Sequence, residues 1–248
     1  MHRPIGTLRP YNQKKDKKKI VLRTLLILAI LAIVGFGVYV SIYYEADEIA
    51  QAAYQQGLDD GTITTQGNMT IITPERPTDT GIIFYPGAKV EAIAYIPLLQ
   101  QLADEGFTVV LIEMPFNMAI FDSNAAKDVF KVAELQDISS WYMMGHSMGG
   151  GMASNYASKN QDKVDGLLLI GAYVYGDYPT EKALTIYGTF NDNLEEKIDY
   201  TDNIVIIEGG NHAQYGNYGE QKGDPTATIS DVEQQSITVD AIVDFLSK

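Results

Sequence analysis

Apolar positions divide the chain into one long uninterrupted run and a longer part in which short apolar runs alternate with polar segments. The long run, "LLILAILAIVGFGVYVSIYY", occupies residues 25–44 and has one clearly polar side chain, Ser41. A helix of that length is about 30 Å long, which matches the hydrocarbon core of a bilayer. The pattern therefore predicts one transmembrane helix over residues 25–44.

The charges on either side of this run predict its orientation. Eight of the 18 Lys and Arg residues lie before residue 45 together with a single acid, Asp16, and the acidic segment "EADE" follows at residues 45–48. By the positive-inside rule, a basic tail of residues 1–24 lies in the cytoplasm. Everything after residue 44 is then expected to be extracytoplasmic, with the protein in the cell membrane.

A cleaved signal peptide is the alternative to an uncleaved anchor. The apolar core of a signal peptide is usually about 7–15 residues long, which is shorter than this run. The nearest A-x-A site, residues 50–52, lies beyond the acidic segment in a stretch with helical character. We therefore expect the run to remain in the protein as an anchor.

Beyond the anchor, the pattern predicts alternating strands and helices. Residues 45–68 are expected to form a juxtamembrane helix, about 46–56 and ended by Gly57, and a polar turn that serves as a linker. Nearly continuous apolar runs such as "FTVVLIEM" are typical of strands buried on both faces. The pattern thus predicts an α/β domain over residues 69–248, with a mainly parallel sheet and helices on both faces. The expected strands are 69–73, 81–85, 107–114, 141–144, 164–171, 183–187 and 203–207, and the expected helices are 92–105, 125–135, 148–159 and 230–246.

Composition limits the chemistry of this domain. The chain has no cysteine, which excludes disulfides, thiolate nucleophiles and Cys-ligated metals. The part after residue 44 holds 10 basic and 31 acidic residues, a net charge of −21. A domain this acidic is a poor candidate for nucleic-acid binding, so no nucleic-acid partner is expected.

The segment "GHSMG", residues 145–149, matches the pattern G-x-S-x-G. It follows a short apolar strand and precedes a helix rich in small residues, which is the setting of a nucleophile elbow. Its glycines give room to a serine in a strained backbone conformation. Neither phosphate-loop spacing, G-x-x-x-x-G-K-[ST] or G-x-G-x-x-G, occurs here. Ser147 is therefore the candidate nucleophile, and the alternative is a glycine-rich packing turn.

A serine hydroxyl needs a base to take its proton, and the chain has three histidines. His2 belongs to the basic tail. His146 is next to Ser147, but consecutive residues of an elbow point in different directions. His212 follows the last expected strand and is the candidate base, with a merely structural histidine as the alternative. The order serine first and histidine last is typical of one fold in particular.

The base in turn needs a carboxylate that fixes its tautomer. Asp192, in "LTIYGTFNDN", follows a strand and a turn and is the preferred candidate, with Asp177 after the preceding strand as the alternative. An oxyanion hole is expected from the backbone N–H of Met148 and from the turn after strand 81–85, where Ala88 is preferred and Lys89 is next. The alternative is that Pro86-Gly87 forms an ordinary turn at the end of this strand, which would have the same sequence.

With these residues placed, the chain from about residue 43 onward resembles the α/β-hydrolase superfamily. Within it the chain is most similar to the small dienelactone-hydrolase-like branch, in particular to bacterial hydrolases with one N-terminal membrane anchor. The resemblance implies a triad of Ser147, Asp192 and His212. Dienelactone hydrolases themselves use a cysteine nucleophile, which this chain lacks, so serine-esterase chemistry fits better. The segments that carry the resemblance are "YEADE", "FYPGAKV", "VVLIEMPFNMAIF", "GHSMGG", "YGTFND" and "EGGNHAQYGNYGEQKGD".

These observations together predict a membrane-anchored serine hydrolase that cleaves small neutral esters without a cofactor or metal. The 45 positions between Ser147 and Asp192 leave no room for a cap domain. An open pocket is expected, shaped by residues 115–121, 172–181 and the Tyr-rich segment after His212. Two alternatives remain: acyl transfer by the same triad, and an inactive hydrolase fold that serves as a surface binding module. The sequence predicts no particular oligomeric state.

Overall fold

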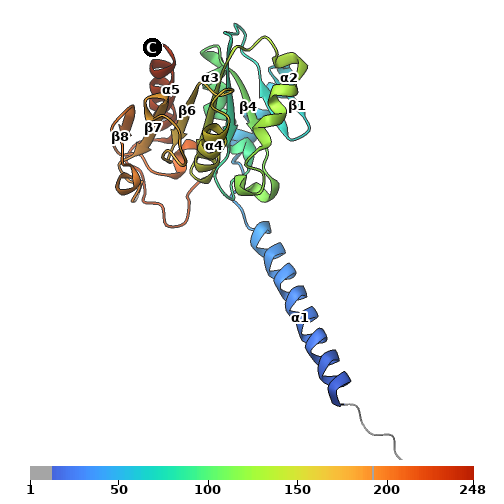
Figure 1. Cartoon of the computed structure of the whole chain (residues 1–248). Helices are drawn as coiled ribbons and strands as arrows, with labels where there is room; N and C mark the ends of the chain where they lie inside the picture. Colours follow the sequence, from blue (N-terminus) through green and yellow to red (C-terminus); the bar gives the residue numbers. More distant parts are fainter. Residues whose placement is uncertain (1–12, 192) are drawn as a thin grey trace, which may run out of the picture. The chain divides into compact units, whose positions relative to one another are not determined.

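The structure, a computed structural model, describes residues 13–191 and 193–248. The chain divides into two units with the boundary between Ile42 and Tyr43. The first contains the helix α1, Gln13–Ser41, whose part Lys17–Ser41 is long and apolar enough to cross a membrane. Its large apolar side chains from Ile20 to Tyr39 are exposed. One helix of this kind is a candidate anchor, as the apolar run predicts (Figure 1).

The second unit, Tyr43–Lys248, is built on one eight-stranded sheet. The strand order is β1-β2-β4-β3-β5-β6-β7-β8. The first two strands pair antiparallel, as do β2 and β4, and the remaining pairs are parallel. The strands are β1 Ile63–Gln66, β2 Met69–Ile72, β3 Thr80–Tyr85, β4 Thr108–Ile112, β5 Ser140–His146, β6 Gly166–Ile170, β7 Ala183–Gly188 and β8 Ile204–Ile207.

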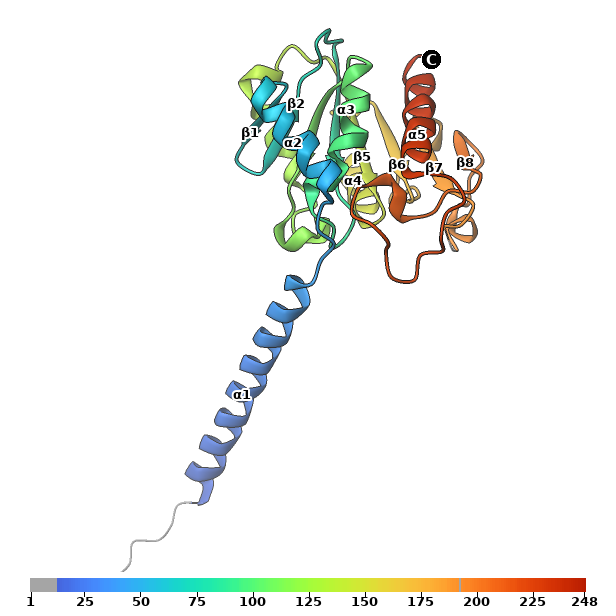
Figure 2. The same ribbon diagram turned by 180° about the vertical axis from the view of Figure 1, so that it is seen from behind.

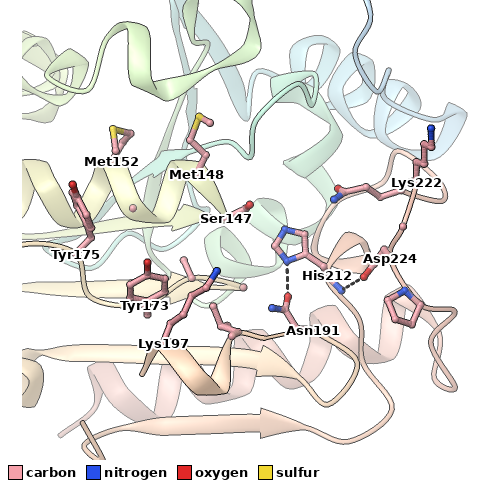
Figure 3. A pocket seen from close by; sticks show the side chains of 17 residues that line it. Ser147, Met148, Met152, Tyr173, Tyr175, Asn191, Lys197, His212, Lys222 and Asp224 are labelled. Carbon is pink, nitrogen blue, oxygen red and sulfur yellow. Dashed lines mark hydrogen bonds between the residues drawn. The ribbon is translucent and has the colours of Figure 1, made fainter. Parts of the chain in front are cut away.

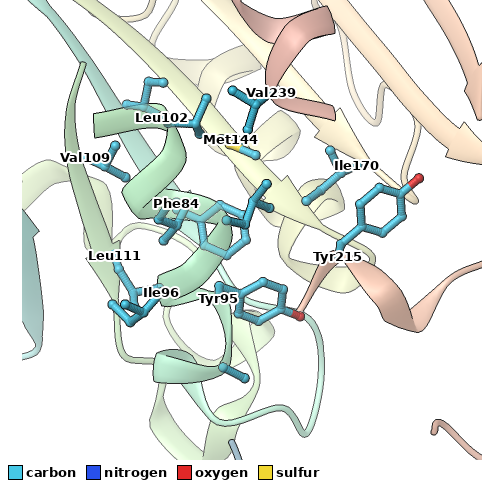
Figure 4. Packing of buried hydrophobic residues seen from close by; sticks show 14 of the residues in the cluster. Phe84, Tyr95, Ile96, Leu102, Val109, Leu111, Met144, Ile170, Tyr215 and Val239 are labelled. Carbon is cyan, nitrogen blue, oxygen red and sulfur yellow. The ribbon is translucent and has the colours of Figure 1, made fainter. Parts of the chain in front are cut away.

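Helices cover both faces of the sheet, as predicted. Figure 2 shows α2, Glu48–Asp60, α3, Ile96–Asp104, and α5, Asp231–Leu246, on one face. The other face carries α4, Met148–Lys159, and two 3₁₀ helices, Ala125–Lys131 and Ala133–Leu135. Each face has its own apolar core. Figure 4 shows one of them, in which side chains of the central strands pack against α3 and α5, including Phe84, Leu111, Met144, Ile170, Ile96, Leu102 and Val239.

Capping residues begin two of these helices. The Ser230 side chain accepts a hydrogen bond from the Glu233 N–H at 3.1 Å, as the Ser-x-x-Glu spacing predicts for α5. Asp47 does the same for α2 through the Ala50 N–H at 2.9 Å. The prediction that Gly57 ends the helix after the anchor is wrong. Gly57 lies inside α2, where a β-carbon would collide with the Ile63 side chain.

Several other boundaries differ from the prediction. The helix α2 ends at Gly61, which adopts the left-handed φ of 74°. The predicted polar turn contains the strand β1, whose side chains are mostly exposed because it lies at the sheet edge. The last strand, β8, lies at the other edge, and only Ile207 of it is buried, so the prediction of a fully buried strand there is wrong. The predicted helix 125–135 is two 3₁₀ helices.

The start of the second unit also differs from the predicted anchor boundary. Tyr44 pairs with Val90 as an isolated bridge, and its N–H donates to the Lys89 carbonyl at 2.7 Å. Tyr44 is thus part of the folded domain, and α2 and β1 belong to the same compact unit. Between β6 and β7 the chain has only residues 171–182, so there is no cap domain at that position, as predicted.

Candidate active site

Ser147 lies in the tight turn between β5 and α4, at the carboxyl edge of the parallel strands. Its φ of 53° and ψ of −121° are strained for a residue with a side chain. A β-carbon on Gly149 would collide with the carbonyl groups of Tyr85 and Pro86, and one on Gly145 with the Gly149 backbone. The two glycines of G-x-S-x-G are therefore required by close packing of the elbow, which is the geometry of an exposed nucleophile.

A cavity of about 460 Å³ opens beside Ser147. Its walls come from the chain segments that follow the parallel strands, because all of these segments meet at one edge of the sheet. Residues 115–121 do not line this cavity, contrary to the prediction. The segment after His212 does line it, but through residues 221–225 and not through its tyrosines, because Tyr215 and Tyr218 are buried. Apolar lining comes from Met148, Met152, Ala172, Tyr173, Tyr175 and Leu194, and polar lining from Ser147, Asn191, Lys197, His212, Gln221, Lys222 and Asp224.

His212 lies in the loop after β8 and lines the same cavity as Ser147. Its Nδ1 is 2.5 Å from Oδ1 of Asn191. An amide oxygen can only accept, so Nδ1 carries the proton and Nε2 keeps a free lone pair. Figure 3 shows the Nε2 end of the ring turned toward Ser147. Among the described residues no hydrogen bond joins the Ser147 hydroxyl to this ring, as is common in sites without a bound substrate.

The position beside Nδ1 is held by a residue that the sequence analysis missed. Asn191 lies in the expected turn after β7, but its side chain is an amide, whereas the sequence predicts a carboxylate beside Nδ1. The preferred acid, Asp192, lies outside the described residues. Asp177, the alternative acid, lies in the loop between β6 and β7 and does not line the cavity.

A second carboxylate near the base, Asp224, was also missed. Its two oxygens accept from the backbone N–H groups of His212 at 3.1 Å and Ala213 at 2.7 Å. It therefore fixes the loop that carries the base rather than the imidazole ring. Burial lowers the pKa of His212, and the charge of Asp224 opposes this shift. The net lowering keeps His212 neutral near pH 7, as a general base requires.

The two expected oxyanion donors differ in how they relate to the cavity. Met148 lines it and is the first residue of α4, so its N–H has no acceptor within the helix. Ala88 lies in the turn after β3 and is not among the lining residues. The second choice, Lys89, donates its N–H to the Asn117 carbonyl at 2.6 Å, which uses that donor.

Comparison with known proteins decides the family. The sequence profile of the alpha/beta hydrolase family matches residues 81–236, more than half of the chain. The chain belongs to this family. It is 24% identical over 153 residues to a candidate non-heme haloperoxidase of Mycobacterium phage D29, covering 58% of this chain. It spans about half of that relative, 54% of its length.

Solved structures share the fold of this α/β hydrolase at low identity. A dienelactone hydrolase from Anabaena variabilis is 15% identical, with a TM-score of 0.50, covering 71% of this chain and 90% of its own. An α/β serine hydrolase without lid from Xanthomonas campestris is 12% identical, with a TM-score of 0.52 and coverage of 71% and 88%. A monoglyceride lipase from Saccharomyces cerevisiae is 9% identical, with a TM-score of 0.50 and coverage of 74% and 93%. The elbow of this hydrolase therefore sits in a known hydrolase framework.

The second histidine of the hydrolase, His146, takes part in a buried network behind the elbow. Its Nδ1 is 2.7 Å from the Tyr95 hydroxyl, and the oxygen of this hydroxyl accepts a hydrogen bond from the Gly87 N–H at 3.1 Å. The network thus joins the elbow to the turn after β3. The ring of His146 lies 4.6 Å from that of His212, measured between centroids. Burial holds the pKa of His146 well below its usual value, and His212 lowers it further.

This low pKa predicts a pH-dependent stability. The unfolded chain protonates His146 near pH 6.5 and the folded protein does not, so the free energy of unfolding falls as the pH drops below about 6.5. One histidine contributes at most about 1.4 kcal/mol per pH unit. We expect His146→Gln to have a correspondingly shallower slope between about pH 6.5 and 5. Urea unfolding of the full chain in detergent, followed by the fluorescence of the single tryptophan, Trp141, measures this. Equal slopes in both proteins would contradict it.

Proposed function

We propose that this chain is a membrane-anchored serine hydrolase that cleaves carboxylic esters through an acyl-enzyme. The observation that carries the proposal is the strained Ser147 elbow in one cavity with His212, whose Nδ1 is held by Asn191 and whose Nε2 faces the serine. A held Nδ1–H fixes the tautomer in which Nε2 can accept a proton. This pairing is what a serine needs to become a nucleophile.

The proposed reaction has two halves. Ser147 Oγ attacks the ester carbonyl while Nε2 of His212 takes the hydroxyl proton, and the resulting oxyanion is held by the N–H groups of Met148 and Ala88. Collapse breaks the bond to the alcohol, which leaves with the proton from His212. Water then attacks the acyl-enzyme, gives its proton to His212, and releases the acid. The proton returns to Ser147, so the enzyme is unchanged.

Asp192 remains the proposed carboxylate of the triad. It follows Asn191 directly in the sequence, and Asn191 is the residue that contacts Nδ1 of His212. A carboxylate there stabilises the imidazolium that forms in the transition state, which an amide dipole does less well. Asn191 then serves to orient the ring.

The substrate class is supported by the lining of the cavity. Met148, Met152, Tyr173 and Leu194 surround the space beside Ser147 with apolar surface, which favours an uncharged acyl group. The net charge of −21 beyond residue 44 disfavours strongly anionic substrates. We therefore propose small neutral esters.

The location of the enzyme is also a proposal. We place residues 1–24 in the cytoplasm, an anchor within residues 25–44, and the juxtamembrane segment 45–68 and hydrolase domain 69–248 outside. The apolar helix Lys17–Ser41 supports the anchor, and the basic tail before it supports the orientation.

A fluorophosphonate probe tests the proposed nucleophile. Such probes bond covalently only to an activated serine, so the wild-type chain should be labelled and Ser147→Ala should not. Ser154→Ala is a matched control. Ser154 is a buried serine of α4 whose hydroxyl donates a hydrogen bond to the Tyr175 carbonyl, and it takes no part in the proposed reaction. Equal labelling of the wild type and Ser147→Ala would refute the proposal.

A further inference from the structure

An exposed apolar loop follows β4 and is unused by the proposed chemistry. Three of its large side chains are half-exposed: Phe116 at 50%, Ile120 at 56% and Phe121 at 49%. The loop is nevertheless well fixed, because Met118 and Ala119 are buried and Phe116 packs edge-on against Phe121. Phe116 itself has a left-handed φ of 56°, which unanchored chain would not maintain. The fold thus holds apolar side chains at the surface instead of burying them.

This apolar loop, residues 116–121, is connected through backbone hydrogen bonds to the first residues of the domain. The Asn117 carbonyl accepts from Lys89, and the Lys89 carbonyl accepts from Tyr44 at 2.7 Å. The Tyr44 hydroxyl in turn accepts from the Lys222 N–H at 3.0 Å, and Lys222 lines the cavity beside Ser147. Tyr44 therefore lies between the apolar loop and the rim of the active site.

Topology places all three features at the same edge of the sheet. The apolar loop follows β4, the Lys89 turn follows β3 and the Lys222 segment follows β8, and these strands run parallel. The candidate membrane helix ends at Ser41, and only two residues separate it from Tyr44. Because three chain steps span at most about 11 Å, Tyr44 cannot lie far from the membrane end of that helix.

We propose that the apolar loop inserts into the lipid bilayer beside the anchor and holds the active-site cavity close to the membrane surface. The substrate class follows: a neutral ester dissolved in the bilayer, which reaches Ser147 without crossing bulk water. This inference rests on the proposed function. Aromatic and aliphatic side chains are typical of protein segments that contact the membrane interface. Since the part of the chain after residue 44 has a net charge of −21, it is not attracted to anionic lipids, and apolar surface is what it can offer a membrane.

The cysteine-free chain allows a direct test of insertion. The full chain is placed in phosphatidylcholine vesicles with an environment-sensitive fluorophore on Ile120→Cys or, as a control, on Ser247→Cys. Ser247 is exposed just after α5, and the C-terminus lies at the opposite edge of the sheet (Figure 2). We expect a blue-shifted emission at position 120 that is quenched by lipids with a spin label on the acyl chain. Position 247 should report water.

Two results of this experiment would overturn the proposal. A label at position 120 that reports water, like position 247, would show that the loop stays outside the bilayer. A blue shift that lipid-borne quenchers do not reduce would show that protein covers the loop, either α1 or a second copy. A chain that fails to float with the vesicles would overturn both the anchor and the insertion.

Turnover separates this inference from the proposed function. The triple variant Phe116→Ser, Ile120→Ser, Phe121→Ser should lose about tenfold in the hydrolysis of a neutral fluorogenic ester that is apolar enough to dissolve in the vesicles. Its hydrolysis of a water-soluble acetyl ester should stay within about twofold of wild type. The matched control is Ile206→Ser, 51% exposed on β8 outside the loop. If the triple variant loses activity equally on both esters, membrane insertion of the loop is overturned, whereas the proposed esterase activity is unaffected. If the loop inserts but the chain shows neither turnover nor probe labelling, membrane insertion of the loop stands and the proposed hydrolase activity is refuted.

Discussion

His212→Ala should lower kcat/KM for a water-soluble ester by roughly 10⁴-fold or more, and His146→Ala by only about tenfold. His212 shares a cavity with Ser147 and has its Nε2 end turned toward the serine. Without it no group takes the serine proton, and the remaining rate comes from binding and the oxyanion donors. His146 is buried, and its Nδ1 contacts the Tyr95 hydroxyl, so its loss disturbs the packing behind the elbow.

Steady-state kinetics of the two variants and the wild type, as full chains in detergent, measure this difference. Circular dichroism of each variant checks that it is folded, because His146→Ala leaves a cavity and removes one of the two hydrogen-bond partners of the Tyr95 hydroxyl. A folded His146→Ala that is as inactive as His212→Ala would contradict the role of His212 as the base.

Much of the fold and part of the candidate site could be predicted from the sequence. Buried strands such as β4 and β6 can be recognised from the sequence, because both faces of each strand are covered and nearly every side chain is therefore apolar. The elbow was predictable because the motif itself is local: Gly145 makes room for the Gly149 backbone four positions on, although Gly149 is also required by its close approach to the distant Tyr85 and Pro86. The same holds for the cap of α5, which spans three residues.

The sequence pattern does not predict those features that are determined by contacts between distant segments of the chain. The strand β1 has a polar sequence and exists because it pairs with β2 at the sheet edge. Tyr44 reads as part of the apolar run, yet its hydrogen bonds to Lys89 and Lys222 join it to distant segments. Asn191 and Asp224 reach the base from separate loops, and no periodic pattern marks such residues. These are contacts of tertiary structure, which a local pattern does not encode.

The second large effect concerns the carboxylate of the triad. Asp192→Asn should cost about 10⁴-fold in kcat, because the imidazolium of the transition state loses its counter-charge. Asn191→Ala should cost about tenfold, since it removes the hydrogen bond at Nδ1 but leaves the carboxylate available. Asp224→Asn should cost less than Asp192→Asn, because Asp224 holds the backbone of the His212 loop.

The dependence of kcat/KM on pH distinguishes the loss of a charge beside His212, in Asp192→Asn, from the loss of a positioning hydrogen bond, in Asn191→Ala. His212 must be neutral to act as a base, so kcat/KM falls as the pH drops through its pKa. Burial already lowers this pKa, which places the acid limb below the usual value of about 6.5. A carboxylate favours the protonated ring and raises the pKa, so Asp192→Asn should move the limb further down, whereas Asn191→Ala should leave it nearly in place. If instead Asn191→Ala removes activity while Asp192→Asn keeps both rate and profile, the hydrolase works with a Ser-His-Asn triad in which Asn191 is the third member.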